Sequence, residues 1–228
     1  EVNPKLSLNI SDVFFKLNVK EKSINITTQN SKIFIDKEFI NLSRIDLNLD
    51  ILKFLRKENA IKKIKILTDK NKIKKFADFI NSYKFSIPRV LFFNQIKDGN
   101  ITAEININFS NKDTSEYFFD VNANIRDAKL NLLNQYKIEE IDFDLNIKEN
   151  KYIIENTKFN TEGINFNSKK IIIKEIDKNY IIEGDIANKK EYINSKYFTK
   201  IFNYETNFLE NKNILAETKN EFKFKINS

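Results

Sequence analysis

Alternation of apolar and polar residues with a period of two dominates this chain. The clearest run lies between residues 100 and 109, where the apolar positions are Ile101, Ala103, Ile105, Ile107 and Phe109. Polar residues, Thr102 and Asn106 among them, stand between these positions. Because successive side chains of a strand point to opposite faces, the run predicts a β-strand with one apolar and one polar face.

The same alternation recurs along the second half of the chain. Its apolar positions are Phe119, Val121, Ala123 and Ile125, followed by Ile141, Phe143, Leu145 and Ile147. Short polar segments at residues 148–151 and 177–179 separate further runs and predict hairpin turns. Strands that follow one another without helical crossovers are typical of an antiparallel meander. We therefore predict a mainly β fold built on a long antiparallel sheet.

Three segments show a helical pattern instead. Asp50 can cap a short helix over residues 51–55, and apolar residues at helical spacing predict a second helix over residues 73–83 with Asp69 as its cap. A weaker pattern predicts a third helix over residues 190–202. The second helix is amphipathic and rich in Lys. Packing of its apolar stripe against the sheet is the favoured interpretation, and the alternative is a helix that lies on a membrane.

Two architectures are compatible with strands that have one apolar face. In a sandwich, two such faces meet and form a closed core, which general avoidance of exposed apolar area favours. In the alternative, one curved sheet leaves its apolar face partly open for a lipid. In either case, residues 1–110 are predicted to form a region of strands with two helices, and residues 111–228 a continuing region of hairpins. The alternative is that the two regions form one continuous domain.

The composition removes most enzyme chemistry. The 228 residues include no Cys, no His and only three Gly. Disulfides, imidazole bases, imidazole metal ligands and Gly-rich phosphate loops are therefore excluded. Asp142 and Asp144 resemble a two-carboxylate metal motif, but we interpret them as exposed strand residues because a metal site needs further ligands. We expect no enzyme activity, no metal and no cofactor.

The charge pattern favours a solvated surface. Lys and Arg number 39 against 32 Asp and Glu, which gives a formal net charge of +7. The Lys residues alternate with apolar residues, and carboxylates lie among them, so nucleic acid is not an expected partner. No stretch approaches the roughly 18 to 20 apolar residues of a membrane span, and residues 1–4 do not resemble a signal peptide. Any membrane anchor is expected outside this chain.

The order of elements resembles the AsmA-like family, which includes TamB-like and YhdP-like envelope proteins. The matching first half comprises alternating strands at residues 5–35, then INLSRIDLNLDILKFLRKENAIKKIKIL (residues 40–67) and LFFNQIKDGNITAEININF (residues 91–109). In the second half, the segments that resemble the repeating β-hairpins of this family are IEEIDFDLNI, YIIENTKFNTEGINFNSKKIIIKEI and YIIEGDIA. The resemblance implies a long curved antiparallel β-sheet with an apolar concave face.

The resemblance also implies a function. Members are periplasmic proteins of Gram-negative bacteria, anchored to the inner membrane, and their apolar groove is thought to carry phospholipid between inner and outer membranes. This chain lacks the expected N-terminal anchor helix, so we expect it to be an internal segment of a longer protein. Outer-membrane or periplasmic envelope proteins are further expected partners. The residues expected to line the groove are Ile105, Ile107, Phe109, Phe119, Val121, Ile125, Phe143, Leu145 and Ile147. The alternative function is a structural or interaction module with a closed core and no ligand, whose edge strands or Lys-rich helix dock envelope proteins.

Overall fold

A computed structural model of the chain shows one antiparallel sheet of twelve strands with two helices, α1 and α2, in its N-terminal half. The structure describes residues 6–83, 90, 93–110, 117–132, 136–149, 151–177, 179–195 and 212–227. The strands are β1 (Leu6–Asn18), β2 (Ser23–Ile35), β3 (Glu38–Asp50), β4 (Ile61–Thr68), β5 (Asn71–Lys72), β6 (Ile96–Phe109), β7 (Tyr117–Leu132), β8 (Tyr136–Lys148), β9 (Lys151–Thr161), β10 (Ile164–Ile176), β11 (Asn179–Asn194) and β12 (Asn213–Asn227).

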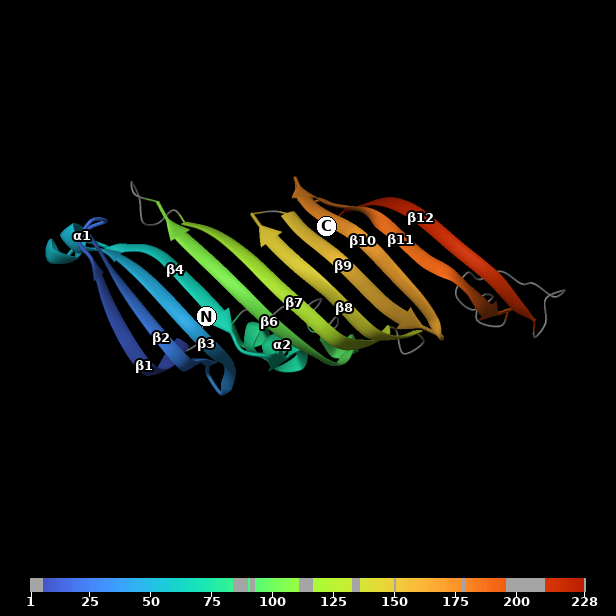
Figure 1. Cartoon of the computed structure of the whole chain (residues 1–228), viewed down its shortest axis with the longest axis horizontal. Coiled ribbons are helices and arrows are strands. Elements are labelled where there is room, and N and C mark those ends of the chain that lie inside the picture. Colours follow the sequence, from blue (N-terminus) through green and yellow to red (C-terminus); the bar gives the residue numbers. More distant parts are fainter. Residues whose placement is uncertain are drawn as a thin grey trace.

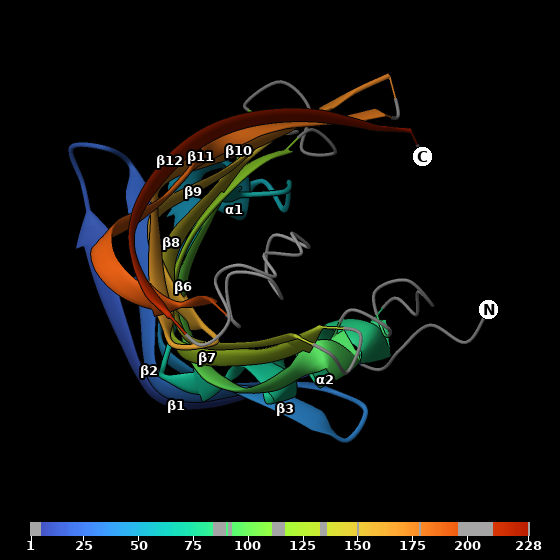
Figure 2. The same cartoon turned by 90° about the vertical axis from the view of Figure 1, so that its right-hand side faces the viewer.

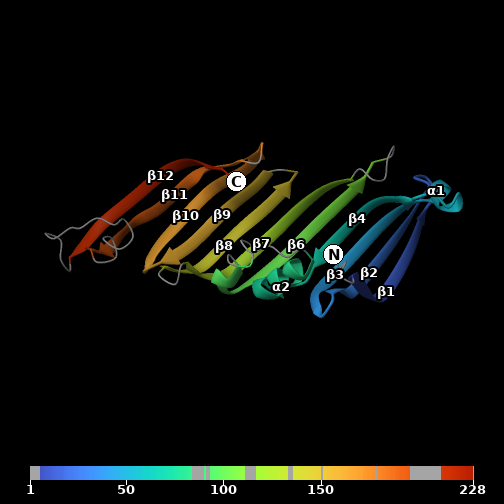
Figure 3. The ribbon, with the colours of Figure 1, turned by 180° about the vertical axis from the view of Figure 1, so that it is seen from behind.

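The strands lie side by side in chain order along the longest axis of the molecule (Figure 1 and, from behind, Figure 3). Apart from β5, the strands pair in chain order, so that β4 pairs with β6, and β5 is a short additional strand that also pairs with β6. The predicted hairpin turns are confirmed, since Lys148 pairs with Lys151 and Ile176 pairs with Asn179. β6 and β7 pair along most of their length, so the sheet runs without a break across residue 110.

The sheet is curved into an open channel with a concave and a convex side, as the view along its long axis shows (Figure 2). We call this channel the gutter. Five strands contain a residue with φ between 48° and 56° in their interior, and these residues are Asp12, Asn30, Asp127, Glu140 and Asn156. Four of the five are Asp or Asn, which adopt this left-handed conformation more readily than most residues. Register shifts adjoin Asp12, Asp127 and Glu140. Such bulges bend strands and increase their twist, and their recurrence in neighbouring strands accounts for the bend of the sheet.

Each bulge also shifts the alternation of faces by one residue. Thr28 and Ser31 flank Asn30, and their hydroxyl oxygens lie 3.0 Å apart in a hydrogen bond, so both side chains point to the same face. Ile125 and Ala128, on either side of the bulge at Asp127, likewise belong to one core cluster. Successive members of the same face are therefore three positions apart at these points, instead of two.

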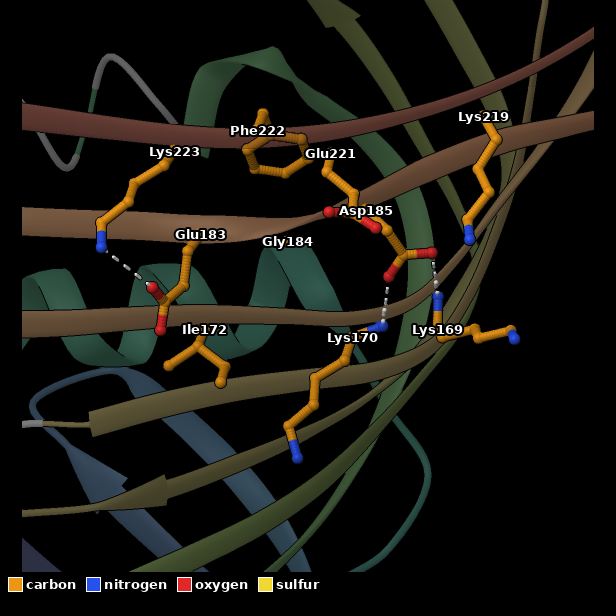
Figure 4. Close-up of a pocket in the computed structure, with 10 residues that line it drawn as sticks. All are labelled: Lys169, Lys170, Ile172, Glu183, Gly184, Asp185, Lys219, Glu221, Phe222 and Lys223. Atoms are coloured by element: carbon orange, nitrogen blue, oxygen red, sulfur yellow. Dashed lines mark hydrogen bonds and ion pairs between the residues drawn. The ribbon is translucent and has the colours of Figure 1, made fainter.

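Carboxylates on the polar face accept the backbone N–H groups that the bulges leave unpaired. Asp142 accepts a hydrogen bond of 2.9 Å from the N–H of Asp127. Asp185 accepts hydrogen bonds from the N–H groups of Lys169 and Lys170, at 3.3 Å and 3.1 Å (Figure 4). These bonds replace ladder hydrogen bonds lost at the register shifts and stabilise the bend. Asp142 therefore has a structural role, and no group of acidic residues in the described ranges is arranged to hold a metal ion.

Of the predicted helices, α1 (Ile51–Leu55) is confirmed together with its cap. The side chain of Asp50 accepts a hydrogen bond from the N–H of Lys53. α2 (Ile73–Tyr83) is also confirmed, but the prediction that Asp69 caps it is wrong, because the helix begins only at Ile73. The side chain of Asn71 bonds the backbone of Asn41 and holds residues 71–72 as β5.

The helix predicted over residues 190–202 is wrong in its first part, because β11 continues to Asn194 and pairs with β12 there. Residues 196–202 lie outside the described residues. The curved open sheet is confirmed, and the described strands form a single layer instead of a sandwich. No helix in the described part of the chain has both the length and the apolar character that a bilayer crossing requires.

Candidate functional site

The concave face carries apolar side chains in rows that cross the sheet from strand to strand. Residues paired between neighbouring strands point to the same face, so the rows follow from the register. The central row takes one residue from each of eleven strands: Val13, Thr28, Ile45, Ile66, Ile105, Val121, Ile147, Tyr152, Ile173, Ile182 and Phe224. Only Thr28 and Tyr152 in this row have a polar group, and no member is charged.

Two further rows flank the central row. The first comprises Phe15, Ile26, Leu47, Ile64, Ile107 and Phe119, and we call it the upper row. The lower row comprises Ala103, Ala123, Leu145, Ile154, Ile171, Gly184 and Phe222. No charged residue interrupts either row. The three rows together make a continuous apolar surface, which we call the groove face.

Six of the nine residues predicted to line a groove belong to the three rows of the groove face, and the other three lie beside these rows. Ile105, Val121 and Ile147 belong to the central row, Ile107 and Phe119 to the upper row, and Leu145 to the lower row. Ile125 and Phe143 pair with each other next to the lower row, on the side away from the central row. Phe109 pairs with Tyr117 at the end of β6, where their ring centroids lie 6.3 Å apart. The structure therefore brings the predicted residues together, and their role in lipid binding stays a prediction.

The groove face is only partly covered by the described residues. Among the described residues, each strand mainly contacts its neighbours in the sheet, and α2 contacts β2, β3, β5 and β6. Ile125 is buried, whereas Phe119 is 42% exposed and Phe15 is 71% exposed. Large apolar side chains thus remain accessible to solvent, and contiguous exposed apolar area of this kind indicates a binding surface.

Small residues form the floor of the gutter. Ala103, Ala123 and Ala128 are among the most buried residues of the groove face and belong to one cluster with Ile125 and Ile141. Side chains on the inside of a bend converge, so small residues there avoid overpacking. Larger residues, Phe15 and Phe119 for example, lie nearer the strand ends and form the walls. This gradation of side-chain size follows the curvature that the bulges impose.

α2 closes one part of the gutter. It lies on the concave side of the sheet (Figure 2), its Ala77 is buried, and it contacts β2, β3, β5 and β6. Packing is therefore the role of its apolar stripe. The approach of α2 depends on Gly99 at the start of β6. A Cβ atom there would lie 2.6 Å from the Cδ1 atom of Ile73 and 2.8 Å from the Cα atom of Ala128.

We expect Gly99→Ala to lower the free energy of unfolding by about 1–3 kcal/mol, because the new methyl group overpacks the contact between α2 and β6. The φ of Gly99, +135°, adds backbone strain for any other residue. The matched control is Gly163→Ala, where φ is +80° but no atom lies within 4 Å of the new methyl group. Denaturant unfolding of both variants measures the difference. Equal losses would show that α2 does not need this close approach.

The polar face holds the charges of the central strands. Hydrogen bonds from Asn106 and from Lys65 lower the pKa of Glu104 below its usual value. A bond from the Asn156 amide, together with the Arg126 guanidinium at 2.6 Å, lowers the pKa of Asp144 in the same way. These carboxylates therefore stay ionised and hydrated on the side opposite the groove face.

A shallow hollow of about 610 Å³ on the polar side of β10, β11 and β12 has a mixed charged lining (Figure 4). Glu183 in this lining is held by Lys174 and Lys223. The hollow is shallow and mixes both signs of charge, so it is not the stronger candidate site. The groove face is the candidate functional site. No protein-family model, no curated protein and no solved structure matches this chain.

Proposed function

We propose that this chain is a non-enzymatic lipid-binding and transfer module, in which phospholipid acyl chains lie along the groove face. The observation that carries the proposal is the uncharged central row, which continues across eleven strands and stays partly exposed. The resemblance to AsmA-like proteins supports the same function and adds its setting. In that setting, the module shields phospholipid between the inner and outer membranes, and the protein is held at the inner membrane by an anchor outside this chain.

Acyl chains would be held by apolar area, without directed bonds. Burial of a chain contributes about 0.8 kcal/mol per methylene group, reduced in an open gutter because one side of the chain stays uncovered. The rows repeat the same chemistry from strand to strand, so no position binds a chain much better than its neighbour. A lipid can therefore slide along the row, with its polar headgroup in water above the gutter. Such a surface suits transfer better than storage.

The length of the rows leads to a prediction on stoichiometry. Eleven strands spaced about 4.8 Å apart span roughly 48 Å, whereas one leaflet of a bilayer core is roughly 15 Å thick. We therefore expect the purified protein to carry more than one phospholipid when lipid is in excess. Native mass spectrometry of the lipid-loaded chain measures this number. Saturation at a single lipid would contradict the sliding surface, and a chain that binds none would favour the interaction module considered from the sequence.

The absence of His from the chain leads to a prediction on pH. The three rows contain no Asp, Glu, His, Lys or Arg, so lipid binding should stay constant between about pH 5 and pH 8. The carboxylates with lowered pKa values, Glu104 and Asp144, stabilise the fold above their unfolded pKa values. That stability is lost as the pH falls below their ordinary pKa values and through the lowered values of the folded protein. Fluorescent-lipid titrations across this range test the claim, and a binding midpoint near pH 6 to 7 would contradict it.

A further inference from the structure

One end of the sheet is formed by the turn between β1 and β2 and by α1 with the loop that follows it. We call this region, residues 16–22 and 50–63, the N-terminal tip. Its two segments are joined by a hydrogen bond of 3.0 Å from the N–H of Ile51 to the carbonyl oxygen of Lys22. Figure 1 places α1 at the extreme end of the long axis, beyond the neighbouring strands. The tip is therefore a projecting end of the gutter.

The N-terminal tip exposes large apolar side chains. α1 has no buried residue, and the exposed fractions are 46% for Leu52, 56% for Phe54 and 71% for Leu55. Val19 in the adjoining turn is 74% exposed, and Leu17 is 62% exposed. Because α1 has no buried residue, its Phe and Leu side chains gain little stability from packing within the described part of the chain. Their presence at a projecting end indicates a surface that is covered by something apolar.

The same tip concentrates the positive charge of the protein. Residues 16–22 and 50–63 contain eight Lys and Arg residues against three Asp and Glu residues. The rest of the chain holds 31 Lys and Arg against 29 Asp and Glu, and is close to neutral. A net +5 on this small region therefore accounts for most of the net charge of +7. An apolar centre with a basic surround matches the interface of a bilayer that contains anionic lipids.

We propose that the N-terminal tip docks the protein on an anionic lipid bilayer, with Phe54, Leu55 and Val19 inserted among the headgroups. Lys20, Arg56 and Lys57 then contact the lipid phosphates. The inference rests on the proposed function, because docking serves to bring lipid to the groove face. The upper row begins at Phe15 in β1, 71% exposed, so docking places the end of the groove face beside the membrane from which a lipid enters.

Vesicle co-sedimentation of the full chain tests the docking. We expect the chain to bind phosphatidylcholine vesicles that contain phosphatidylglycerol, to bind pure phosphatidylcholine vesicles weakly, and to lose binding as salt rises. The double variant Lys20→Glu with Arg56→Glu should partition onto these vesicles about tenfold more weakly or worse. Each basic residue near an anionic surface contributes substantially to binding. Phe54→Ser should weaken binding without unfolding, because its side chain is exposed.

The opposite edge of the sheet supplies matched controls. Leu215 in β12 lies outside the three rows and is 46% exposed, against 56% for Phe54, so Leu215→Ser should leave vesicle binding unchanged. Lys219→Glu with Lys225→Glu, at two exposed positions of β12, is the control for charge. Equal loss in the tip and control variants would overturn the proposal, because general apolar or electrostatic adhesion would then explain binding. Absence of vesicle binding by the unaltered chain would overturn it as well.

Docking and the groove can fail separately. If a photoreactive residue on the groove face captures no lipid while the tip variants still abolish vesicle binding, the proposed function fails and docking stands. If lipid is captured from monomeric dispersion but tip variants bind vesicles as well as the unaltered chain does, docking fails and the groove stands.

Discussion

Ile107→Asp should give a protein that is folded but cannot hold lipid. Ile107 lies in the upper row, paired with Ile64 and Phe119, and its side chain is only partly buried. In an open gutter the new carboxylate can keep water, so we expect the free energy of unfolding to fall by only about 1–2 kcal/mol. An acyl chain laid across that position would have to desolvate the charge, at a cost of several kcal/mol. Lipid capture should therefore drop by a factor of ten or more.

Asn108→Asp is the matched control, one residue further along β6 and on the polar face. Its position is exposed and lies opposite Lys63 of β4, so the added charge sits in water beside a cation. Both folding and lipid capture should be unchanged. Thermal melting by circular dichroism, run beside a lipid-capture assay, separates the outcomes. An Ile107→Asp variant that is unfolded at room temperature would show that the groove face is packed like a closed core.

The second large effect concerns the bulges that bend the sheet. Replacing Asp127, Glu140 and Asn156 together by Val should destabilise the protein by several kcal/mol, because a β-branched residue is strongly disfavoured at positive φ and each left-handed residue costs about 1–2 kcal/mol. The three positions occupy neighbouring strands, β7, β8 and β9, so the bend should open in the centre of the gutter. Lipid capture should fall with it.

The same three positions changed to Gly provide the control for this experiment. Gly adopts positive φ without a steric penalty, so the bulges should persist and stability should change by about 1 kcal/mol or less per position. The cross-section measured by small-angle X-ray scattering should match that of the unaltered chain. If the Val and Gly variants have the same stability and shape, the left-handed residues do not set the curvature.

Much of the fold could be predicted from alternation alone. The run from Ile101 to Phe109 identified β6, and the pattern around Phe143 identified β8, because a period of two has a single structural interpretation when the run is long. The choice between a sandwich and an open gutter could not be made on this basis. Both architectures require one apolar face per strand, and only spatial pairing shows whether a second layer covers it.

The bulges were missed although the sequence carries their signal. In segments such as Ile125-Arg126-Asp127-Ala128 and Ile154-Glu155-Asn156-Thr157, two polar residues separate residues of the same face, and the second is Asp or Asn. A break in alternation at a residue that tolerates positive φ predicts a bulge. The cap of α2 was misassigned for a different reason. The bond between Asn71 and Asn41 joins residues thirty positions apart, and local pattern contains no information on it.

Two neighbouring phenylalanines of β7 offer the most direct test of the groove. Phe119 belongs to the upper row on the groove face, whereas Phe118 pairs with Asn108 on the polar face. Both side chains are exposed, at 42% and 60%, so a photoreactive phenylalanine analogue fits either position with little disturbance. The account predicts that the analogue at position 119 crosslinks phospholipid in cells and that the analogue at position 118 does not. Equal capture at both positions, or capture at 118 alone, would contradict it.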